Sequence, residues 1–363
     1  MKKYWIVVFL SVVLSMAGKA EQIDRRIMVE LPADSLTSLS LMAQCISHRY
    51  HKPDTRLWGL YSWVATHIRY DMSARDQQMR MPKEDDLALW TLQNRRGVCA
   101  NFAQLFAAVA RRMHIETYAV SGYIVTFDNI RDDGHEWCAC IIDGKPYIFD
   151  PTWGGGYMLN NQQYVSRLDD QFFMVAPEKM ILTHVPEDPL FQFLNYPKYY
   201  DEIDNPGKDR PVPVYRSWRD SLWAYNRQDS IARLEGELRR MRDNGFANDW
   251  IQQEIKRVQY NYQVCLYNKQ NNRMNGLVTR LNFLVNYFNN GYKPHRSRQW
   301  LNTEIAKIRG EIPDITEKLE IVNSISDTMS VGVDQMIKGL NSASDQLDLM
   351  QKSIEQNYNR YNQ

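Results

Sequence analysis

A stripe of apolar residues spaced three to four apart predicts an amphipathic helix over residues 98–113. Its members are Val98, Phe102, Leu105, Phe106, Val109 and Met113. This spacing collects them on one face of a 3.6-residue helix, the face that packs into a core. Gly97 lies just outside the stripe. We therefore expect Cys99 in the first helical turn, where backbone N–H groups have no partner within the helix.

The period changes to that of β-strands in two stretches, residues 135–142 and 145–150, which are separated by Asp143-Gly144. This dipeptide is typical of a two-residue hairpin turn. Side chains alternate between the two faces of a strand, so His135 and Asp150 are expected on the same face of the hairpin. They would be diagonal neighbours, roughly 7–8 Å apart at the backbone, which their side chains can bridge.

The remaining pattern is mostly helical. Residues 36–50 and 54–70 carry apolar stripes ahead of the Cys99 helix, and residues 201–213 are rich in proline and charge, as a linker would be. Beyond them the stripes cover 231–241, 251–288 and 305–354, with Pro313 as a predicted kink or restart. Long helices with narrow stripes must pair with one another. Residues 214–309 hold 17 Lys/Arg and 8 Asp/Glu, and residues 310–363 hold 4 and 9, which favours an antiparallel pairing.

The expected fold is therefore α+β, followed by an all-α part. Residues 21–200 should form the α+β domain, with the Cys99 helix packed on an antiparallel sheet. Residues 201–213 should be the linker, and residues 214–363 an antiparallel coiled coil or helical bundle.

The N-terminus predicts export. Lys2 and Lys3 precede an apolar run and small residues that end at Ala20, the pattern of a secretory signal peptide over residues 1–20. That run is too short to span a bilayer, which takes about 20 apolar residues. We expect an exported protein, periplasmic, in the cell envelope or secreted, without a transmembrane segment. The formal charge of +1 argues against a nucleic-acid partner.

The candidate chemistry belongs to Cys99, His135 and Asp150. A thiol at a helix N-terminus loses its proton more easily, a histidine can serve as its base, and a carboxylate can orient that histidine. A buried cysteine that merely packs is the alternative for Cys99 taken alone. Trp90 and Gln93 precede the thiol and are candidate oxyanion donors, against packing for Trp90 and solvation for Gln93. The run Gly154–Gly156 favours a flexible turn over a phosphate cradle, because no helix is signalled after it.

Three ordered motifs carry a resemblance to a known family. Gly97-Val98-Cys99, His135-Glu136-Trp137 and Asp150-Pro151-Thr152-Trp153 resemble the transglutaminase-like (papain-related) superfamily. The likeness extends from about residue 55 to 195, and its tail, over residues 177–192, resembles the kyphoscoliosis-peptidase-like branch. By this resemblance, Cys99, His135 and Asp150 correspond to the catalytic triad. Trp137 and Trp153, which stand in the histidine and aspartate motifs, are candidates for substrate binding. Cys138 departs from the polar residue often found there.

The resemblance implies a thiol enzyme that forms an acyl intermediate from an amide, with no metal or organic cofactor. Hydrolysis would make it a cysteine peptidase or amidase acting on a protein or cell-envelope peptide. Transfer to an amine would make it a crosslinking transglutaminase, and the same residues serve both reactions. A third hypothesis is a non-catalytic module that binds a peptide in the same groove. The helical region could also bind a protein partner or a second copy of the chain.

Overall fold

The computed structural model describes residues 29–75, 83–126, 129–159, 163–204, 207, 214–245, 248–291 and 296–361. Contacts among these residues divide the chain into two compact units. The first comprises the described residues up to Ser121 together with Gly134–Met180, and the second comprises Gly122–Asp133 and the described residues from Ile181 on. The predicted signal peptide and most of the predicted linker lie outside the described residues.

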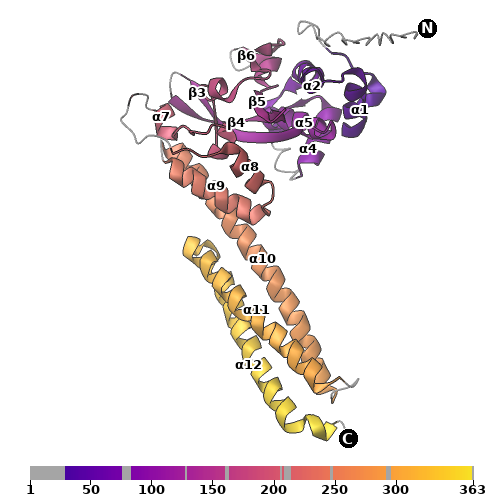
Figure 1. Cartoon of the computed structure of the whole chain (residues 1–363), viewed down its shortest axis with the longest axis vertical. Helices are drawn as coiled ribbons and strands as arrows, with labels where there is room; N and C mark the ends of the chain where they lie inside the picture. Colours follow the sequence, from indigo (N-terminus) through magenta and orange to yellow (C-terminus); the bar gives the residue numbers. More distant parts are fainter. Residues whose placement is uncertain are drawn as a thin grey trace, which may run out of the picture. The chain divides into compact units, whose positions relative to one another are not determined.

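The first unit is built around one central helix (Figure 1). This helix, α5, runs over Cys99–Arg112, as the apolar stripe predicts. It packs against three others: α1 (Leu39–Arg49), α2 (Pro53–His67) and α4 (Glu84–Asn94). Burial extends beyond the predicted face, because the alanines of α5, among them Ala103, Ala107 and Ala110, are also buried. Small side chains let the neighbouring helices come close on several sides.

The main sheet has four strands in the order β5-β4-β3-β8. Their bounds are β3 Glu116–Thr126, β4 Asn129–Ile142, β5 Lys145–Phe149 and β8 His184–Pro186. β4 and β5 are antiparallel, with Ile142 opposite Lys145 and Cys138 opposite Phe149, which confirms the predicted hairpin and its register. β8 pairs with the end of β3, with Gly122 opposite Pro186. The α+β architecture is confirmed.

Short elements complete the first unit. They are η1 (Ala33–Leu36), β1 (Arg69–Tyr70), η2 (Met72–Ala74), β2 (Arg96–Gly97), η3 (Trp153–Gly155), β6 (Gly156–Leu159), β7 (Gln163–Ser166), η4 (Asp170–Phe172) and α6 (Pro177–Met180). The three-glycine run is a close-packed turn and not a flexible one. A Cβ on Gly154 would lie 1.7 Å from the Tyr61 hydroxyl, and one on Gly155 would lie 2.4 Å from the Ala65 carbonyl oxygen. The glycines are needed because helix α2 passes directly against this turn.

The second unit contains the end of β3, the start of β4 and the whole of β8, and is otherwise helical. Its helices are η5 (Pro189–Gln192), α7 (Tyr200–Asp204), α8 (Trp218–Tyr225), α9 (Ser230–Asn244), α10 (Asp249–Asn289), α11 (Arg298–Ile325), η6 (Asp327–Met329) and α12 (Ser330–Tyr361). The three long helices share an apolar core and alternate in direction (Figure 1). Arg280 on α10 pairs with Glu311 on α11, and Arg309 on α11 pairs with Asp348 on α12. The predicted all-α region is confirmed.

One detail of that region differs from the prediction. The stripe over 305–354 belongs to two helices, and the chain breaks at Ser326 instead of Pro313. α11 continues through Pro313. The break coincides with a hydrogen-bonded turn, where the Ser326 hydroxyl donates to Gln263 Oε1 at 2.8 Å. No helix in the described part of the chain is both long and apolar enough to cross a bilayer.

Residues 181–200, which the sequence pattern assigns to the α+β domain, group with the helices. Arg240 on α9 binds Asp188 through two hydrogen bonds, of 2.7 and 2.6 Å. Tyr200 is fully buried in a cluster with residues of α9 and α10, including Met241 and Ile255. These contacts join the segment after β8 to the start of the helical region.

Candidate active site

Cys99 is the first residue of α5 and is half-buried. The helix begins there because Asn101 caps it. The Val98 N–H donates to Asn101 Oδ1 at 3.0 Å, and Asn101 Nδ2 donates to Thr91 Oγ1 at 2.8 Å. The thiol therefore lies in the first turn of α5, at the positive end of the helix dipole.

Asn101 is a positioning residue that the sequence pattern does not single out. It is fully buried, and its side chain lies so close to Gly97 that a Cβ there would be 2.2 Å from Asn101 Cγ. The absence of a side chain at Gly97 thus leaves room for Asn101 to cap the helix that carries Cys99. The signal that could have found Asn101 is its place three residues after the N-cap, where a side chain can reach back to the cap's N–H.

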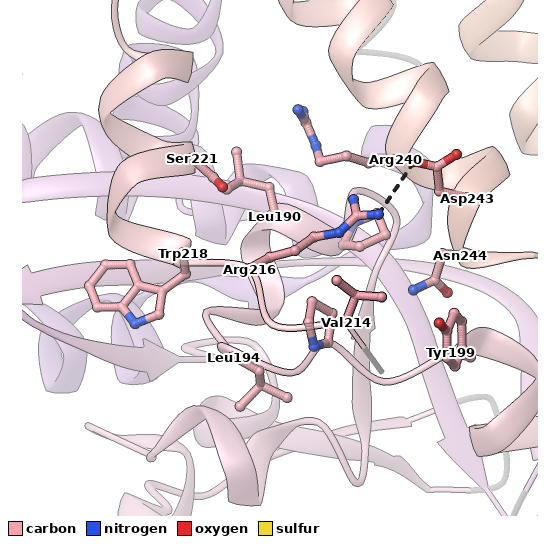
Figure 2. Close-up of a pocket in the computed structure, with 12 residues that line it drawn as sticks. Leu190, Leu194, Tyr199, Val214, Arg216, Trp218, Ser221, Arg240, Asp243 and Asn244 are labelled. Atoms are coloured by element: carbon pink, nitrogen blue, oxygen red, sulfur yellow. Dashed lines mark hydrogen bonds and ion pairs between the residues drawn. The ribbon is translucent and has the colours of Figure 1, made fainter. Parts of the chain in front are cut away.

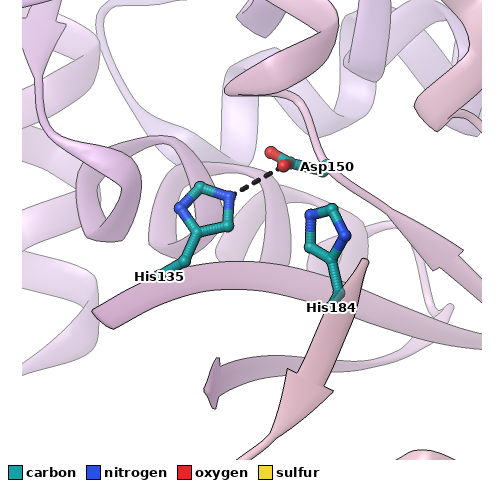
Figure 3. Close-up of side chains that lie close together, drawn as sticks. All are labelled: His135, Asp150 and His184. Atoms are coloured by element: carbon teal, nitrogen blue, oxygen red, sulfur yellow. Dashed lines mark hydrogen bonds and ion pairs between the residues drawn. The ribbon is translucent and has the colours of Figure 1, made fainter. Parts of the chain in front are cut away.

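His135 and Asp150 lie together, as the hairpin register predicts. His135 Nε2 is 2.8 Å from Asp150 Oδ2 (Figure 3). The second oxygen, Asp150 Oδ1, accepts from the N–H groups of Thr152 at 2.8 Å and Trp153 at 3.1 Å. The carboxylate is fully buried and fixed by the turn that follows β5. Since Nε2 faces Asp150, Nδ1 is the ring nitrogen that can exchange a proton with a thiol. Figure 3 also draws His184, which belongs to the second unit, where Thr183 Oγ1 lies 2.8 Å from its Nδ1.

The electrostatics favour a charged imidazole. Burial on its own would lower the pKa of His135. The charge and hydrogen bond of Asp150, joined by the hydrogen bond and charge of Cys99, outweigh burial and raise that pKa to about 10. Opposite charges nearby stabilise the ionised form, and more so where water is excluded. The imidazolium form of His135 is therefore favoured at neutral pH.

Two predicted tryptophans flank the histidine ring. Trp153 lies 5.5 Å from it between ring centroids, and Trp137 lies 6.0 Å from it. Trp137 is only 1% exposed, so it supports the ring from within the core and is not available to a substrate. Trp153 is half-buried and packs edge-on against Phe172 at 5.4 Å. Of the two, Trp153 is the one with surface left to meet a substrate.

The structure places the other two predicted residues on α4. Gln93 is exposed in the last turn of that helix. Trp90 is half-buried, and the Arg96 guanidinium lies 6.0 Å from the centroid of its ring. Neither is joined to Cys99, His135 or Asp150 by a contact described for these residues. A role in binding the oxyanion stays a prediction for both.

Residues 42–151, which include Cys99, His135 and Asp150, match the family model of the transglutaminase-like superfamily. This stretch is a transglutaminase-like domain. Kyphoscoliosis peptidase from Mus musculus is 22% identical to the chain over 200 residues, and that from Homo sapiens is 23% identical over 202. These matches cover 52% and 53% of the chain. The chain spans about 30% of the length of these curated relatives.

Two solved structures are also similar to the chain. One is a candidate cysteine protease from Cytophaga hutchinsonii, with 20% identity and a TM-score of 0.26 over 40% of this chain and 51% of that one. The other is a TGase, with 15% identity and a TM-score of 0.27 over 59% of this chain and 51% of that one. The assignment of the transglutaminase-like domain rests on the family model and the curated relatives.

A separate pocket lies wholly within the second unit (Figure 2). Leu190, Leu194 and Trp218 contribute to its lining, and Arg216 pairs with Asp243 at 3.4 Å along its wall. Its volume is about 50 Å³. Pockets for small-molecule ligands usually measure about 300–1,000 Å³. This one has room for little more than water, and we assign it no part in the chemistry.

Proposed function

We propose that this protein is a cysteine peptidase or amidase that acts through Cys99, His135 and Asp150. The observation that carries the proposal is the fixed His135–Asp150 pair in the same domain as a thiol at a helix N-terminus. The transglutaminase-like match and the relatives named kyphoscoliosis peptidase agree with it. A module that only binds peptides would have no need for a buried carboxylate that holds the histidine.

In the first half-reaction, the Cys99 thiolate attacks the carbonyl carbon of an amide. The backbone N–H of Cys99, in the first turn of α5, can donate to the developing oxyanion and stabilise it. His135 gives its proton to the leaving nitrogen, the C–N bond breaks, and a thioester on Cys99 remains with a neutral imidazole. Asp150 keeps the imidazole in the orientation that both steps need.

In the second half-reaction, a water molecule attacks the thioester. His135 takes one proton from that water, the C–S bond breaks, and a carboxylic acid leaves. The thiolate and the imidazolium are restored. If a primary amine attacks instead, the product is a new amide, and the enzyme is a transglutaminase. We propose hydrolysis, since the predicted signal peptide points to export into a water-rich compartment.

The test is labelling by a thiol-reactive electrophile at neutral pH, followed by peptide mapping. We expect fast and selective modification of Cys99 in the wild type and a rate at least about 100-fold lower in His135→Ala. Cys265→Ala, which removes a half-buried thiol of the second unit, is the matched control and should change nothing. Equal labelling of Cys99 in the wild type and in His135→Ala would reject the enzyme and favour the binding module.

The reaction type needs a second experiment. Substrates in an envelope extract that acylate the unlabelled Cys99 can be isolated as thioesters on the protein, with Cys99→Ala as the control. Peptides identified in this way are then incubated with the protein, with and without a primary amine. Mass spectrometry distinguishes the outcomes: the hydrolysed acid supports the peptidase, and the amine adduct supports transfer.

A further inference from the structure

A buried side-chain pair joins the helix that carries Cys99 to the strand that carries His135. Gln104 on α5 donates through Nε2 to Glu136 Oε1 on β4, at 2.6 Å. Glu136 is 7% exposed and follows His135 directly in the chain. Gln104 lies little more than one helical turn after Cys99. The pair therefore bridges the two elements whose separation decides whether thiol and imidazole can exchange a proton.

The bridge is incomplete if Glu136 is a carboxylate. Gln104 Oε1 is buried and has no hydrogen-bond partner. A carboxylate offers acceptors only, whereas a protonated carboxyl group also carries one O–H donor. An acid and an amide side chain can then form two opposed hydrogen bonds, N–H to C=O and O–H to C=O. This arrangement supplies the donor that Gln104 Oε1 lacks.

The charges around Glu136 favour the proton as well. Burial raises the pKa of Glu136 to about 7, with the hydrogen bond from Gln104 opposing the rise. Glu84 on α4 adds to the rise, and His135 on the same strand as Glu136 opposes it. Glu84 is itself paired with Arg111 at 2.9 Å. An uncharged Glu136 avoids placing a second negative charge in this interior.

We infer that Glu136 carries a proton in the folded protein and closes a reciprocal acid–amide pair with Gln104, which positions the Cys99 helix against the His135 strand. Glu136 and Gln104 are thus positioning residues. Their effect on chemistry rests on the proposed function, but the proton on Glu136 does not. The inference gives residue 136, inside the His135-Glu136-Trp137 motif, a role of its own.

Infrared spectroscopy tests the proton directly. Other buried acids contribute to the spectrum, since the pKa of Glu187 is also raised to about 7, by burial first of all. The informative signal is therefore the difference between wild type and Glu136→Gln. At about pH 5.5 we expect the difference spectrum to contain a wild-type C=O band of a protonated carboxyl, which fades toward about pH 8.5. The absence of this band from the difference spectrum at the lower pH would overturn the inference.

Labelling of Cys99 tests the positioning role. Glu136→Leu leaves the Gln104 amide without a partner, and we expect labelling to slow by about 10-fold. Glu136→Gln restores a reciprocal pair, amide to amide, and should recover most of the rate and remove the pH dependence that Glu136 adds. An equal loss in both variants would overturn the positioning role. A wild type whose Cys99 is unreactive would reject the proposed function instead, and the infrared result would still decide the proton.

Discussion

The two units of this protein both bury polar side chains, but they use them for different purposes. In the first unit, Asp150 and Asn101 are fully buried, and their hydrogen bonds lead to His135 and to the N-terminus of the Cys99 helix. In the second unit, Gln263 is 1% exposed and donates to the carbonyl oxygens of Val322 and Ser326, both at 2.9 Å. Interior polar groups need partners in either place. The groups they hold differ: the bonds in the first unit fix His135 and the start of the helix that carries Cys99, and those in the second unit fix the end of α11.

The largest effect is expected from Asp150→Asn. The amide can still accept from the N–H groups of Thr152 and Trp153, so the turn should persist. It cannot stabilise the His135 imidazolium, and in enzymes with a Ser-His-Asp triad such a change costs about 10⁴-fold in turnover. We expect a loss of roughly 10³-fold or more in the rate of Cys99 acylation, measured by stopped-flow labelling. Circular dichroism should report an unchanged fold, and near-normal acylation would contradict the role of Asp150.

The pH dependence of the reaction at Cys99 tests the effect of Asp150 on the pKa of His135. The pKa of His135 is raised to about 10, so its imidazolium, present at all lower pH, is lost as pH rises through that value. We expect the rate of Cys99 acylation by an amide to fall near about pH 10 in the wild type, because the leaving amine takes its proton from the imidazolium. In Asp150→Asn the fall should come at lower pH, because the charge that favours the imidazolium is gone. Stability linked to this proton follows the same direction, complete below the unfolded pKa and lost as pH rises toward 10. The measurement is the rate of acylation by an amide from neutral to alkaline pH, and identical pH profiles in the two proteins would contradict the expectation.

Asn101→Ala should have a smaller effect, shared between folding and chemistry. It removes the cap on Val98 N–H and leaves Thr91 without its donor, which costs about 1–3 kcal/mol of unfolding free energy for buried groups. Chemical denaturation measures this loss. Asn101→Asp is the matched control, since it keeps the acceptor for Val98 N–H and loses only the bond to Thr91. A cap role requires Asp to retain more stability than Ala.

The equivalent change in the second unit is Gln263→Leu. It keeps most of the volume but removes the donor to Val322 and Ser326 and the acceptor for the Ser326 hydroxyl. We expect a loss of about 1–3 kcal/mol of unfolding free energy with Cys99 labelling within about twofold of wild type. A marked fall in Cys99 labelling in a variant that stays folded would contradict the prediction that Gln263 acts on stability alone.

The smallest effect belongs to Arg280→Gln. Arg280 and Glu311 form a two-point ion pair, at 2.8 and 2.7 Å, but their side chains are 39% and 36% exposed. Pairs exposed to this degree usually contribute about 0.2–1 kcal/mol, and salt screens them. Thermal unfolding at low and high salt should show a shift of a few degrees at most in the first condition and less in the second. A larger loss would mean that this pair acts as the buried groups do.

The sequence predicts those parts of the fold that rest on local signals. Asp143-Gly144 sets the hairpin loop, and with it the register that brings His135 and Asp150 together. The spacing of apolar residues sets α5 and therefore the place of Cys99. Both signals lie within the segment that they organise, which is why they can be interpreted without knowledge of the rest of the chain.

The missed features depend on residues far apart in the chain. Asn101 bonds with Thr91 on another helix, and Gln104 with Glu136 on a strand. The break between α11 and α12 coincides with contacts from Gln263 on α10, although Pro313 is the local signal for a break. The glycine run predicts a flexible turn at Gly154, but the Tyr61 hydroxyl packs closely against this residue. In each case a partner distant in sequence decides the outcome.

The grouping of β8 with the helices bears on how the protein can be dissected. A fragment that stops at Met180 lacks β8, the strand that pairs with residues 122–124 of β3. β3 would then be an edge strand with unpaired amide and carbonyl groups exposed to solvent. Exposed edge strands of this kind pair with strands of other molecules and cause aggregation. A minimal soluble fragment should therefore retain Val185 and the residues packed against it, and one that omits them should precipitate even though it contains Cys99, His135 and Asp150.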